Sequence, residues 1–383
     1  MSDTESATAP RVEPVAAPAP APAGRWRTPK PYLWTAFAVL LLALPFYLDR
    51  SWLQAGLFAM AAAIAAIGLN LLTGATGQLS MGHAFFLAVG AYSYCILAAD
   101  SEGIGSERSL TGFGLPGWLA VLLAVGISGI AGGLFSPIAG RLRGAYLGIA
   151  TLALIFIGQH VLFNARDLTG GFNGRTVPPL SLFGVDFDDS QTVVMNVPFE
   201  STEKLWYVAL AALLLCALFA RGILRGRPGR AMNAIRDHRI AAGVMGVPVA
   251  RYRASVFVLS SMYAGLAGVL LALVFQRTVP EYFGMVLSLE FLAMIVIGGL
   301  GSVRGAVIGA AFVSLLPQLL TRYSDSLPLV TAPGTGVGGI APGEAARYLY
   351  GAAVVAVVLF LPGGLSRLRL SPLRFGKPRK GSK

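Results

Sequence analysis

One segment of this sequence concentrates charged residues between two long apolar runs. Residues 221–253 hold eight arginines and a single acid, Asp237. A charged side chain at the centre of a bilayer costs about 2.5–3.5 kcal/mol on the insertion scale, so this basic segment does not enter lipid. Positive charge collects in the cytoplasmic loops of membrane proteins. We therefore expect residues 221–253 to lie in the cytoplasm.

A short amphipathic helix is predicted inside this basic segment. Small and apolar side chains recur every three or four residues between positions 231 and 245, which is the helical repeat. Pro228-Gly229 precedes the pattern, and Gly246 ends it. Two interpretations stay open, a helical topology signal or a docking helix for a cytoplasmic partner. The docking residues would be Arg230, Ala234, Ile235, Arg236, His238, Ala241, Ala242, Met245 and Gly246.

Two glycine-rich segments, residues 72–83 and 297–305, interrupt apolar runs at comparable places in the two halves of the chain. Paired interruptions often mark a transport pathway, because non-helical backbone at membrane depth survives only beside protein or water. Two tight cytoplasmic turns are the other interpretation of these segments.

Few polar side chains lie within or beside the apolar runs. Glu290 either sits favourably near the N-terminus of a helix or lines a pathway, since a carboxylate inside a membrane is costly. The other polar groups either make hydrogen bonds between helices or contact a substrate. The pathway candidates are Asn70, Gln78, His83, Glu290, Gly298, Gly299 and Gly301.

Patterns for catalysis, cofactors and nucleotides are missing from the sequence. It has no G-x-x-x-x-G-K-[ST] loop, no H-E-x-x-H pattern and no serine nucleophile elbow. Its two cysteines, Cys95 and Cys216, are isolated and provide neither metal-site spacing nor a disulfide framework. We expect no enzyme activity and no cofactor. If ATP drives transport here, another polypeptide is the ATPase.

The composition identifies the elements that must position these groups. The 383 residues are 55% hydrophobic and 13% charged, whereas about 25% are charged in soluble domains. Long apolar runs without alternation predict transmembrane helices, so the fold class is an all-α polytopic membrane protein. The net charge of +12 sits in a few loops and the C-terminal tail. That distribution favours membrane orientation over nucleic-acid binding.

About ten transmembrane helices are predicted, at about 17–25 residues for each span. Loops assigned to the outside carry acids, and loops assigned to the inside carry arginines. This alternation predicts that both termini are cytoplasmic. The predicted spans are residues 32–48, 52–73, 83–99, 117–137, 144–163, 205–220, 254–275, 287–300, 305–320 and 345–361.

The domain organisation follows from these spans. Residues 1–31 form a predicted disordered, Ala- and Pro-rich cytoplasmic tail rather than a signal peptide. Residues 32–365 form the transmembrane domain, whose long external loop, residues 164–204, is either a solvated connector or a platform for an external partner. Residues 366–383 form a basic cytoplasmic tail.

With these residues assembled, positions 55–365 resemble the permease subunits of branched-chain amino acid ABC importers, the hydrophobic amino acid uptake type. The two breaks and the basic loop carry much of the resemblance. The motifs are GLNLLTGATGQLSMGHAFF (68–86), RGAYLGIATL (143–152), LTGGFNG (168–174), GRAMNAIR (229–236), IAAGVMG (240–246), SLEFL (288–292) and IGGLGS (297–302).

The resemblance implies a bacterial inner-membrane protein with several partners. These are two ATP-binding subunits, a second related permease, an extracytoplasmic solute-binding protein and the membrane lipid. The helix at about 230–245 would be the coupling helix that enters a groove of the ATPase. The family often has an acid where this chain has Gly243, so a salt bridge from that position is not expected here.

Two other transport functions remain open at this point. Permeases of urea and short-amide importers are close relatives of the same family. A self-contained, proton-coupled transporter would use Glu290 or a histidine as its proton-linked group, but the shortage of membrane carboxylates argues against it.

Overall fold

The structure is a computed structural model of the 383-residue chain. It describes residues 39–100, 102–104, 108–142, 144–182, 185–187, 192–194, 197–323, 341–360 and 364–365. The chain divides into two compact units, Met1–Leu44 and Pro45–Lys383. In the first unit, residues 39–43 are helical. All contacts discussed below lie within the second unit.

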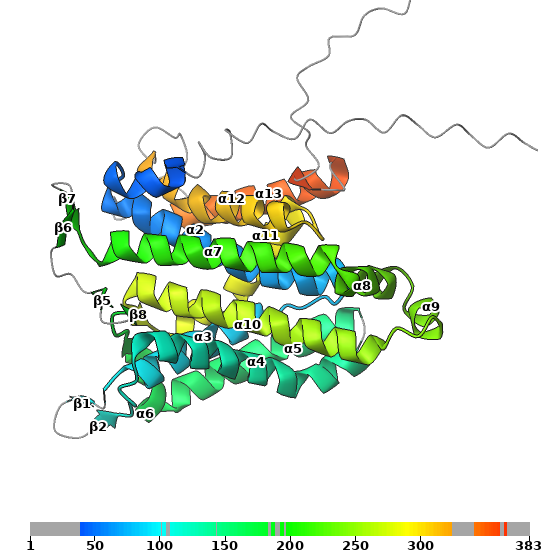
Figure 1. The fold of residues 1–383 in the computed structure, drawn as a ribbon, viewed down its shortest axis with the longest axis horizontal. Helices are drawn as coiled ribbons and strands as arrows, with labels where there is room; N and C mark the ends of the chain where they lie inside the picture. Colours follow the sequence, from blue (N-terminus) through cyan, green and yellow to red (C-terminus); the bar gives the residue numbers. More distant parts are fainter. Residues whose placement is uncertain are drawn as a thin grey trace, which may run out of the picture. The chain divides into compact units, whose positions relative to one another are not determined.

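Helices dominate the described part of the chain, as the composition predicts (Figure 1). Two of them, α8 and α9, lie at one end of the long helices, and the hairpins β1–β2 and β6–β7 lie at the other. The helices are η1 (Leu44–Phe46), α2 (Arg50–Asn70), η2 (Leu71–Ala75), α3 (His83–Ala98), α4 (Gly117–Arg141), α5 (Ala145–Asn164), α6 (Arg166–Thr169), η4 (Gly171–Asn173), α7 (Ser201–Arg225), α8 (Arg227–Asp237), α9 (Arg239–Val244), α10 (Val249–Phe275), η5 (Pro280–Phe283), α11 (Met285–Gly298), α12 (Val303–Arg322) and α13 (Pro342–Phe360).

Short antiparallel strand pairs connect helices at the end opposite α8. Most of these pairs are local, but β3 pairs with β8 across a long stretch of sequence, with Arg175 opposite Thr278. The strands are β1 (Glu102–Ile104), β2 (Arg108–Leu110), β3 (Arg175–Thr176), β4 (Ser181–Leu182), β5 (Val185–Asp186), β6 (Thr192–Val194), β7 (Val197–Phe199) and β8 (Arg277–Thr278). They pair as β1–β2, β3–β8, β4–β5 and β6–β7.

The described residues include six helices that are long and apolar enough to span a membrane, namely α2 with η2, α4, α5, α7, α10 and α12. The apolar helices α3 and α11 are shorter. A multi-pass, all-α membrane protein is confirmed, whereas the count of ten and the orientation of the termini stay predictions. Residues 32–38 of the first predicted span, together with residues 1–31 and 366–383, lie outside the described residues.

Helices α2 and α10 form the centre of the bundle. The apolar part of α2 with η2 is 89% buried and that of α10 is 78% buried. Lipid tails are as apolar as leucine, so helices in a membrane associate through close packing rather than through the hydrophobic effect. The run from Ala61 to Ala66 contains five alanines. These small side chains let neighbouring helices approach the α2 backbone.

Glycines bring α3 and α10 into backbone contact. A Cβ atom on Gly90 of α3 would collide with the backbone of Gly265 in α10, and a Cβ on Gly268 would collide with the carbonyl of Leu87. Small residues at such crossings allow the van der Waals contact that holds membrane helices together. By contrast, α7 is only 11% buried over its apolar part. Its exposed Leu214, Leu218 and Phe219 suit a lipid environment.

The Gly268→Ala variant should be less stable because its new methyl group meets the Leu87 carbonyl. Overpacking of this kind costs about 1–3 kcal/mol. Thermal unfolding in detergent, followed by size-exclusion chromatography, measures the effect. The control is Gly126→Ala, since a Cβ on Gly126 meets nothing within 4 Å. Alanine should be neutral or stabilising at position 126. Equal unfolding temperatures for the two variants would contradict the close contact between α3 and α10 at Gly268.

Candidate functional site

The arginine-rich segment folds as an elbow of two helices, α8 and α9. The single helix predicted at 230–245 is therefore wrong, because His238 leaves the helical conformation, with φ −153° and ψ 91°. Pro228 lies in the first turn of α8, where proline is well tolerated. Gly246, with φ +83°, follows α9 as a chain-reversing residue. The predicted stop at Gly246 is thus confirmed.

The buried face of the elbow differs from the predicted stripe. Met232, Ile235 and Ala242 are buried. The predicted stripe residues Ala234, His238 and Ala241, as well as Arg230 and Gly246, are exposed. Of the predicted docking residues, Ile235 and Ala242 thus pack inside the chain, next to Met232, which the pattern did not include.

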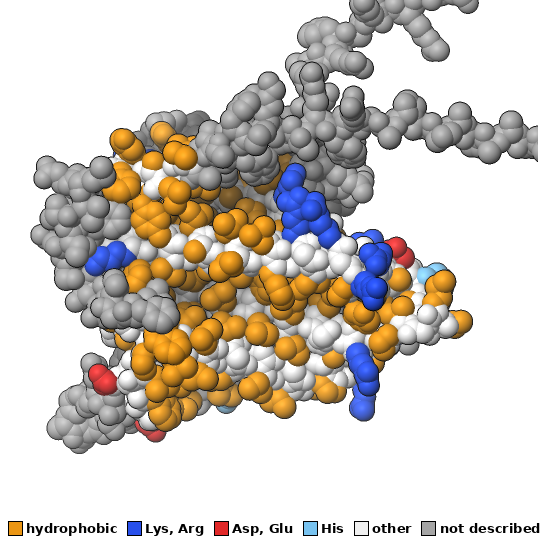
Figure 2. All heavy atoms as spheres, viewed as in Figure 1, with side chains coloured by type: hydrophobic (Ala, Val, Ile, Leu, Met, Phe, Trp, Pro, Cys, Tyr) orange, Lys and Arg blue, Asp and Glu red, His pale blue; other side chains and the backbone are white. Residues whose placement is uncertain are grey.

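The tip of the elbow exposes large apolar side chains. Ile240 is 76% exposed, Val244 85% and Met245 84%. Figure 2 shows hydrophobic side chains at this tip beyond the arginines that gather at the same end of the molecule. A hollow of about 470 Å³ beside the tip is lined by Asp237, His238, Arg239, Ile240, Gly243 and Val249. Exposed apolar groups surrounded by charge are typical of a protein-binding surface.

Arg236 connects the elbow to the first glycine-rich break. Its Nη1 donates a hydrogen bond of 2.9 Å to the carbonyl oxygen of Gly74. Its Cγ would lie 3.2 Å from a Cβ on Gly77, a residue with φ +69°. The same guanidinium forms an ion pair with Asp237, with 3.1 Å between Nε and Oδ1. Arg236 therefore covers the point where the helix from α2 through η2 comes to an end.

Asn70 joins the two breaks to each other. Its Nδ2 donates to the Ser302 carbonyl at 2.9 Å, and its Oδ1 accepts from the Gly301 N–H at 2.8 Å. A Cβ on Gly74 would collide with the Gly301 nitrogen. The two glycine-rich segments thus meet at one junction, although Asn70 and Gly301 are 231 residues apart in the sequence. Arg236 lies beside this junction.

The second break is a tight turn between α11 and α12. Gly299 and Gly301 adopt φ values of +112° and +81°, which other residues rarely tolerate. Ser302 caps α12, since its side-chain oxygen accepts from the Gly305 N–H at 3.1 Å. Gly298 lies so close to Gly305 that a Cβ on either residue would collide with the other's carbonyl.

The first break continues as a buried, non-helical segment between η2 and α3. Gln78 and Ser80 are each only 2% exposed. The Gln78 Nε2 donates to Thr76 Oγ1 at 2.9 Å and to the Arg253 carbonyl at 3.3 Å. The Met81 N–H donates to Thr151 Oγ1 of α5 at 2.9 Å. This irregular backbone is therefore held by contacts within the protein, as membrane structures require of backbone shielded from water.

Arg253 fastens the start of α10 to the end of α4. This buried guanidinium donates to the carbonyls of Ala139, Gly140 and Leu142 at 3.0, 2.9 and 3.2 Å. The last carbonyls of a helix lack partners within the helix, and arginine side chains satisfy them. In the sequence Arg253 is one of eight arginines of the basic segment, and this role was not predicted. The one sequence signal for this role was its position directly before an apolar run, which separates it from the other arginines of the segment.

His83 and Glu290 lie apart from the junction. His83 is buried, with Nε2 2.9 Å from the Ala65 carbonyl and its ring edge-on to Phe291 at 5.7 Å. Glu290 is half-buried and lines a separate cavity of about 500 Å³. Of the seven pathway candidates, the structure brings Asn70, Gly298, Gly299 and Gly301 together. Gln78 lies nearby in the first break.

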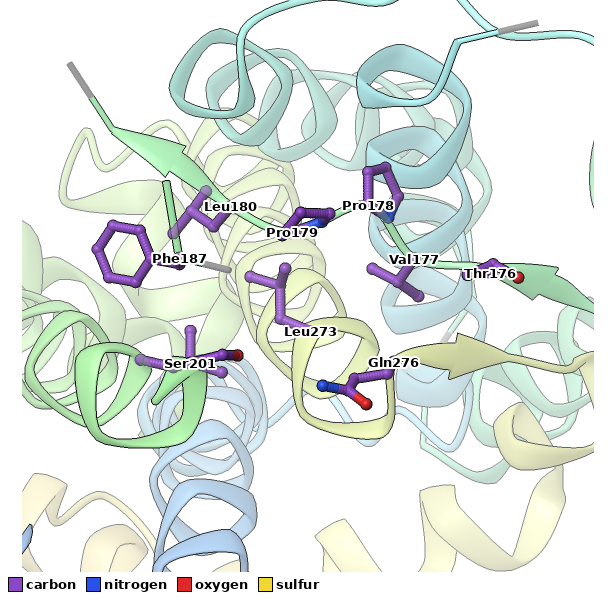
Figure 3. Close-up of a pocket in the computed structure, with 10 residues that line it drawn as sticks. Thr176, Val177, Pro178, Pro179, Leu180, Phe187, Ser201, Leu273 and Gln276 are labelled. Atoms are coloured by element: carbon purple, nitrogen blue, oxygen red, sulfur yellow. The ribbon is translucent and has the colours of Figure 1, made fainter. Parts of the chain in front are cut away.

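The described parts of the 164–204 loop fold onto the opposite end of the bundle. The Tyr94 hydroxyl of α3 donates to the Pro178 carbonyl at 3.2 Å. A hollow of about 210 Å³ lies beneath this loop. Figure 3 shows Pro179 and Leu180 on one side of it, with Leu273 and Ser201 on the other.

A family model described as "Branched-chain amino acid transport system / permease component" matches residues 53–358. The chain belongs to this family. The match covers both breaks, the elbow and the long loop, so the resemblance read from the motifs is confirmed.

Curated permeases align with most of the chain. The high-affinity branched-chain amino acid transport system permease protein LivM of Salmonella typhimurium is 30% identical over 302 residues, which are 76% of this chain and 68% of that protein. The corresponding LivH of Escherichia coli strain K12 is 29% identical over 267 residues, 68% of this chain and 82% of that protein. The permease family and the candidate spans agree on a multi-pass membrane protein.

No group of three or more His, Cys, Asp or Glu side chains among the described residues is placed to hold a metal ion. The site is instead a set of backbone and side-chain hydrogen bonds among α8, η2 and the α11–α12 turn.

The Asn70→Leu variant should unfold at a lower temperature in detergent, because it leaves the Gly301 N–H and the Ser302 carbonyl without their partner. Each buried backbone group left unpaired costs about 1–3 kcal/mol. Asn164→Leu is the control, since Asn164 bonds the His160 carbonyl at an exposed helix end where water can replace it. Equal losses in the two variants would argue against the junction.

Proposed function

We propose that this chain is one of two permease subunits of an ATP-driven importer of branched-chain or other hydrophobic amino acids. It forms part of the translocation pathway and does no covalent chemistry. The observation that carries the proposal is the hydrogen bond from Arg236, in the elbow, to Gly74 at the junction of both helix breaks. That bond gives a peripheral helix a direct mechanical connection to the interior of the bundle.

Two observations support docking of the elbow on a separate ATPase subunit. Its tip exposes the apolar side chains of Ile240, Val244 and Met245. The arginines of the same segment keep this tip out of the lipid, so another protein is needed to cover it. The chain also has no phosphate-binding loop of its own. In this mechanism two ATPase subunits close on ATP, the elbow follows, and Arg236 transmits the movement to the α11–α12 turn.

The relatives support a second, related permease as partner. The chain resembles proteins titled LivM and proteins titled LivH, which are both permease proteins of high-affinity branched-chain amino acid transport systems. We infer that two such subunits assemble in a bacterial inner membrane with the elbow in the cytoplasm. The opposite end, with the Tyr94–Pro178 bond and the hollow beneath the loop, would receive a solute-binding protein.

A charge at the tip of the elbow should prevent docking. Replacing Val244 by glutamate puts a carboxylate where an apolar side chain is 85% exposed in the isolated chain. Burial of such a side chain is worth about 1.5–3 kcal/mol, so binding of the ATPase should weaken at least about tenfold. Co-purification with the ATPase subunits measures the loss. Val244→Leu keeps the apolar surface and should bind normally, and normal binding by Val244→Glu would refute docking at this tip.

Loss of the Arg236 connection should uncouple hydrolysis from uptake. In Arg236→Gln the complex should still assemble, but leucine imported per ATP hydrolysed should fall about tenfold, because a hydrogen bond from a charged group contributes about 1.5–3 kcal/mol. Uptake and ATPase activity are measured in the same proteoliposomes. Arg251→Gln removes an exposed charge from the same basic segment and should couple normally. Equal ratios in both variants would exclude Arg236 as the connection.

A further inference from the structure

A cavity of about 500 Å³ with apolar and polar lining lies among α2, α10, α11, α12 and α13, in the half of the bundle away from the elbow. Its volume falls within the range of about 300–1,000 Å³ that is typical of small-molecule sites. A smaller hollow of about 160 Å³ shares Ser51 and Gln318 with it and includes Arg322 at the end of α12. The two hollows together lead from the helix ends into the bundle.

Several polar side chains line the cavity. Glu290 of α11 and Gln54 of α2 line it, together with Gln318 and Ser314 of α12. The Ser314 side chain is 6% exposed, and its buried Oγ has no hydrogen-bond partner among the described residues. A buried hydroxyl without a partner is costly. A bound ligand would provide the missing partner once the hydroxyl rotates toward the cavity.

The floor of the cavity is closed toward the elbow. Met294 and Val313 are buried there, at 1% and 2% exposure. Below them, a Cβ on Gly309 would collide with the Met294 carbonyl, and Gly298 touches Gly305. From Glu290 to Gly298 is about 12 Å along α11, at about 1.5 Å per residue. The closed floor thus ends at the turn that Asn70 binds.

We propose that this cavity binds the α-ammonium group of a zwitterionic amino acid, with Glu290 as its carboxylate partner. The inference rests on the proposed importer function and names the membrane site of its substrate. A carboxylate inside a membrane bundle is costly, and a cationic ligand offsets that cost through a charge-assisted hydrogen bond. Glu290 is the charged side chain among the residues that line the cavity, with Gln54, Gln318 and Ser314 as its polar neighbours.

The cavity and the neighbouring hollow extend to the helix ends away from the elbow, at Ser51 and Arg322, whereas the floor toward the elbow is closed. Substrate released by an external binding protein can therefore reach Glu290 while the path to the other side stays shut. Movement of the α11–α12 turn, which is bonded to Asn70 and lies beside Arg236, would separate the Gly298–Gly305 contact and open the floor.

Uptake of radiolabelled leucine tests the site in proteoliposomes that contain this chain, the second permease, the ATPase subunits and the binding protein. Size-exclusion chromatography confirms that each variant assembles. Glu290→Gln keeps the shape but removes the charge, and uptake should fall about tenfold or more. Glu290→Asp should retain most of it. Glu281→Gln is the matched control, since Glu281 is exposed on η5 at the same end and does not line the cavity.

A second measurement tests the position of the site directly. A cysteine in place of Ser314 should react with a membrane-impermeant thiol reagent added outside, and leucine should slow the reaction. Protection by leucine should disappear when Glu290→Gln is added. The parent chain, with its own Cys95 and Cys216, gives the background rate.

The outcomes separate the two proposals. Failure of the wild-type complex to import leucine would overturn the proposed function and this site with it. Leucine import by Glu290→Gln at the wild-type rate would overturn only the site. Protection of the Ser314→Cys variant by urea but not by leucine would overturn the zwitterion and favour an amide substrate.

Discussion

Hydrogen bonding of exposed backbone at helix ends inside the bundle is the constraint on which the rest of this structure depends. Lipid offers no donors or acceptors, so every interrupted helix must find partners within the protein. Asn70 and Arg236 satisfy backbone groups at the two glycine-rich breaks, and Arg253 satisfies the end of α4. These three side chains determine where the elbow, the breaks and α10 lie relative to one another.

Glycine provides a second constraint, which is the short distance between the backbones of crossing helices. At the α11–α12 crossing and at the α3–α10 crossing, backbone atoms touch where a Cβ would not fit. Such crossings hold helices through close contact rather than through large interlocking side chains. The α11–α12 crossing is therefore both closed and free of bulky side chains that would block its separation. That combination suits a barrier that opens and closes in each transport cycle.

The same arrangement gives the two ends of the protein different surfaces. The elbow end is basic, and its apolar tip has no cover in the isolated chain. The opposite end has a folded loop over a small hollow and an entrance to the cavity that contains Glu290. The proposed import function, with substrate from one partner and movement from another, would use this asymmetry. The junction at Asn70 lies between the two ends.

The sequence by itself determined the fold class, the apolar segments, the basic loop and the family, because these depend on local composition and on contiguous motifs. It also identified both glycine-rich breaks and the stop at Gly246. It did not determine that the basic loop bends at His238, since the spacing of apolar residues alone reads as one continuous helix. Ile240 and Val244 were missed for the same reason, because a bend changes which side chains face outward.

Only the tertiary structure decided which breaks, charges and polar groups meet. The Asn70–Gly301 and Arg236–Gly74 bonds join residues 231 and 162 positions apart. No periodicity in one segment encodes a contact with another, so such contacts become visible only when the helices pack. The sequence also left two interpretations of Glu290 open. Its place in a cavity follows from the packing of the five helices that line that cavity. Local patterns fixed the elements, and packing between distant elements fixed the site.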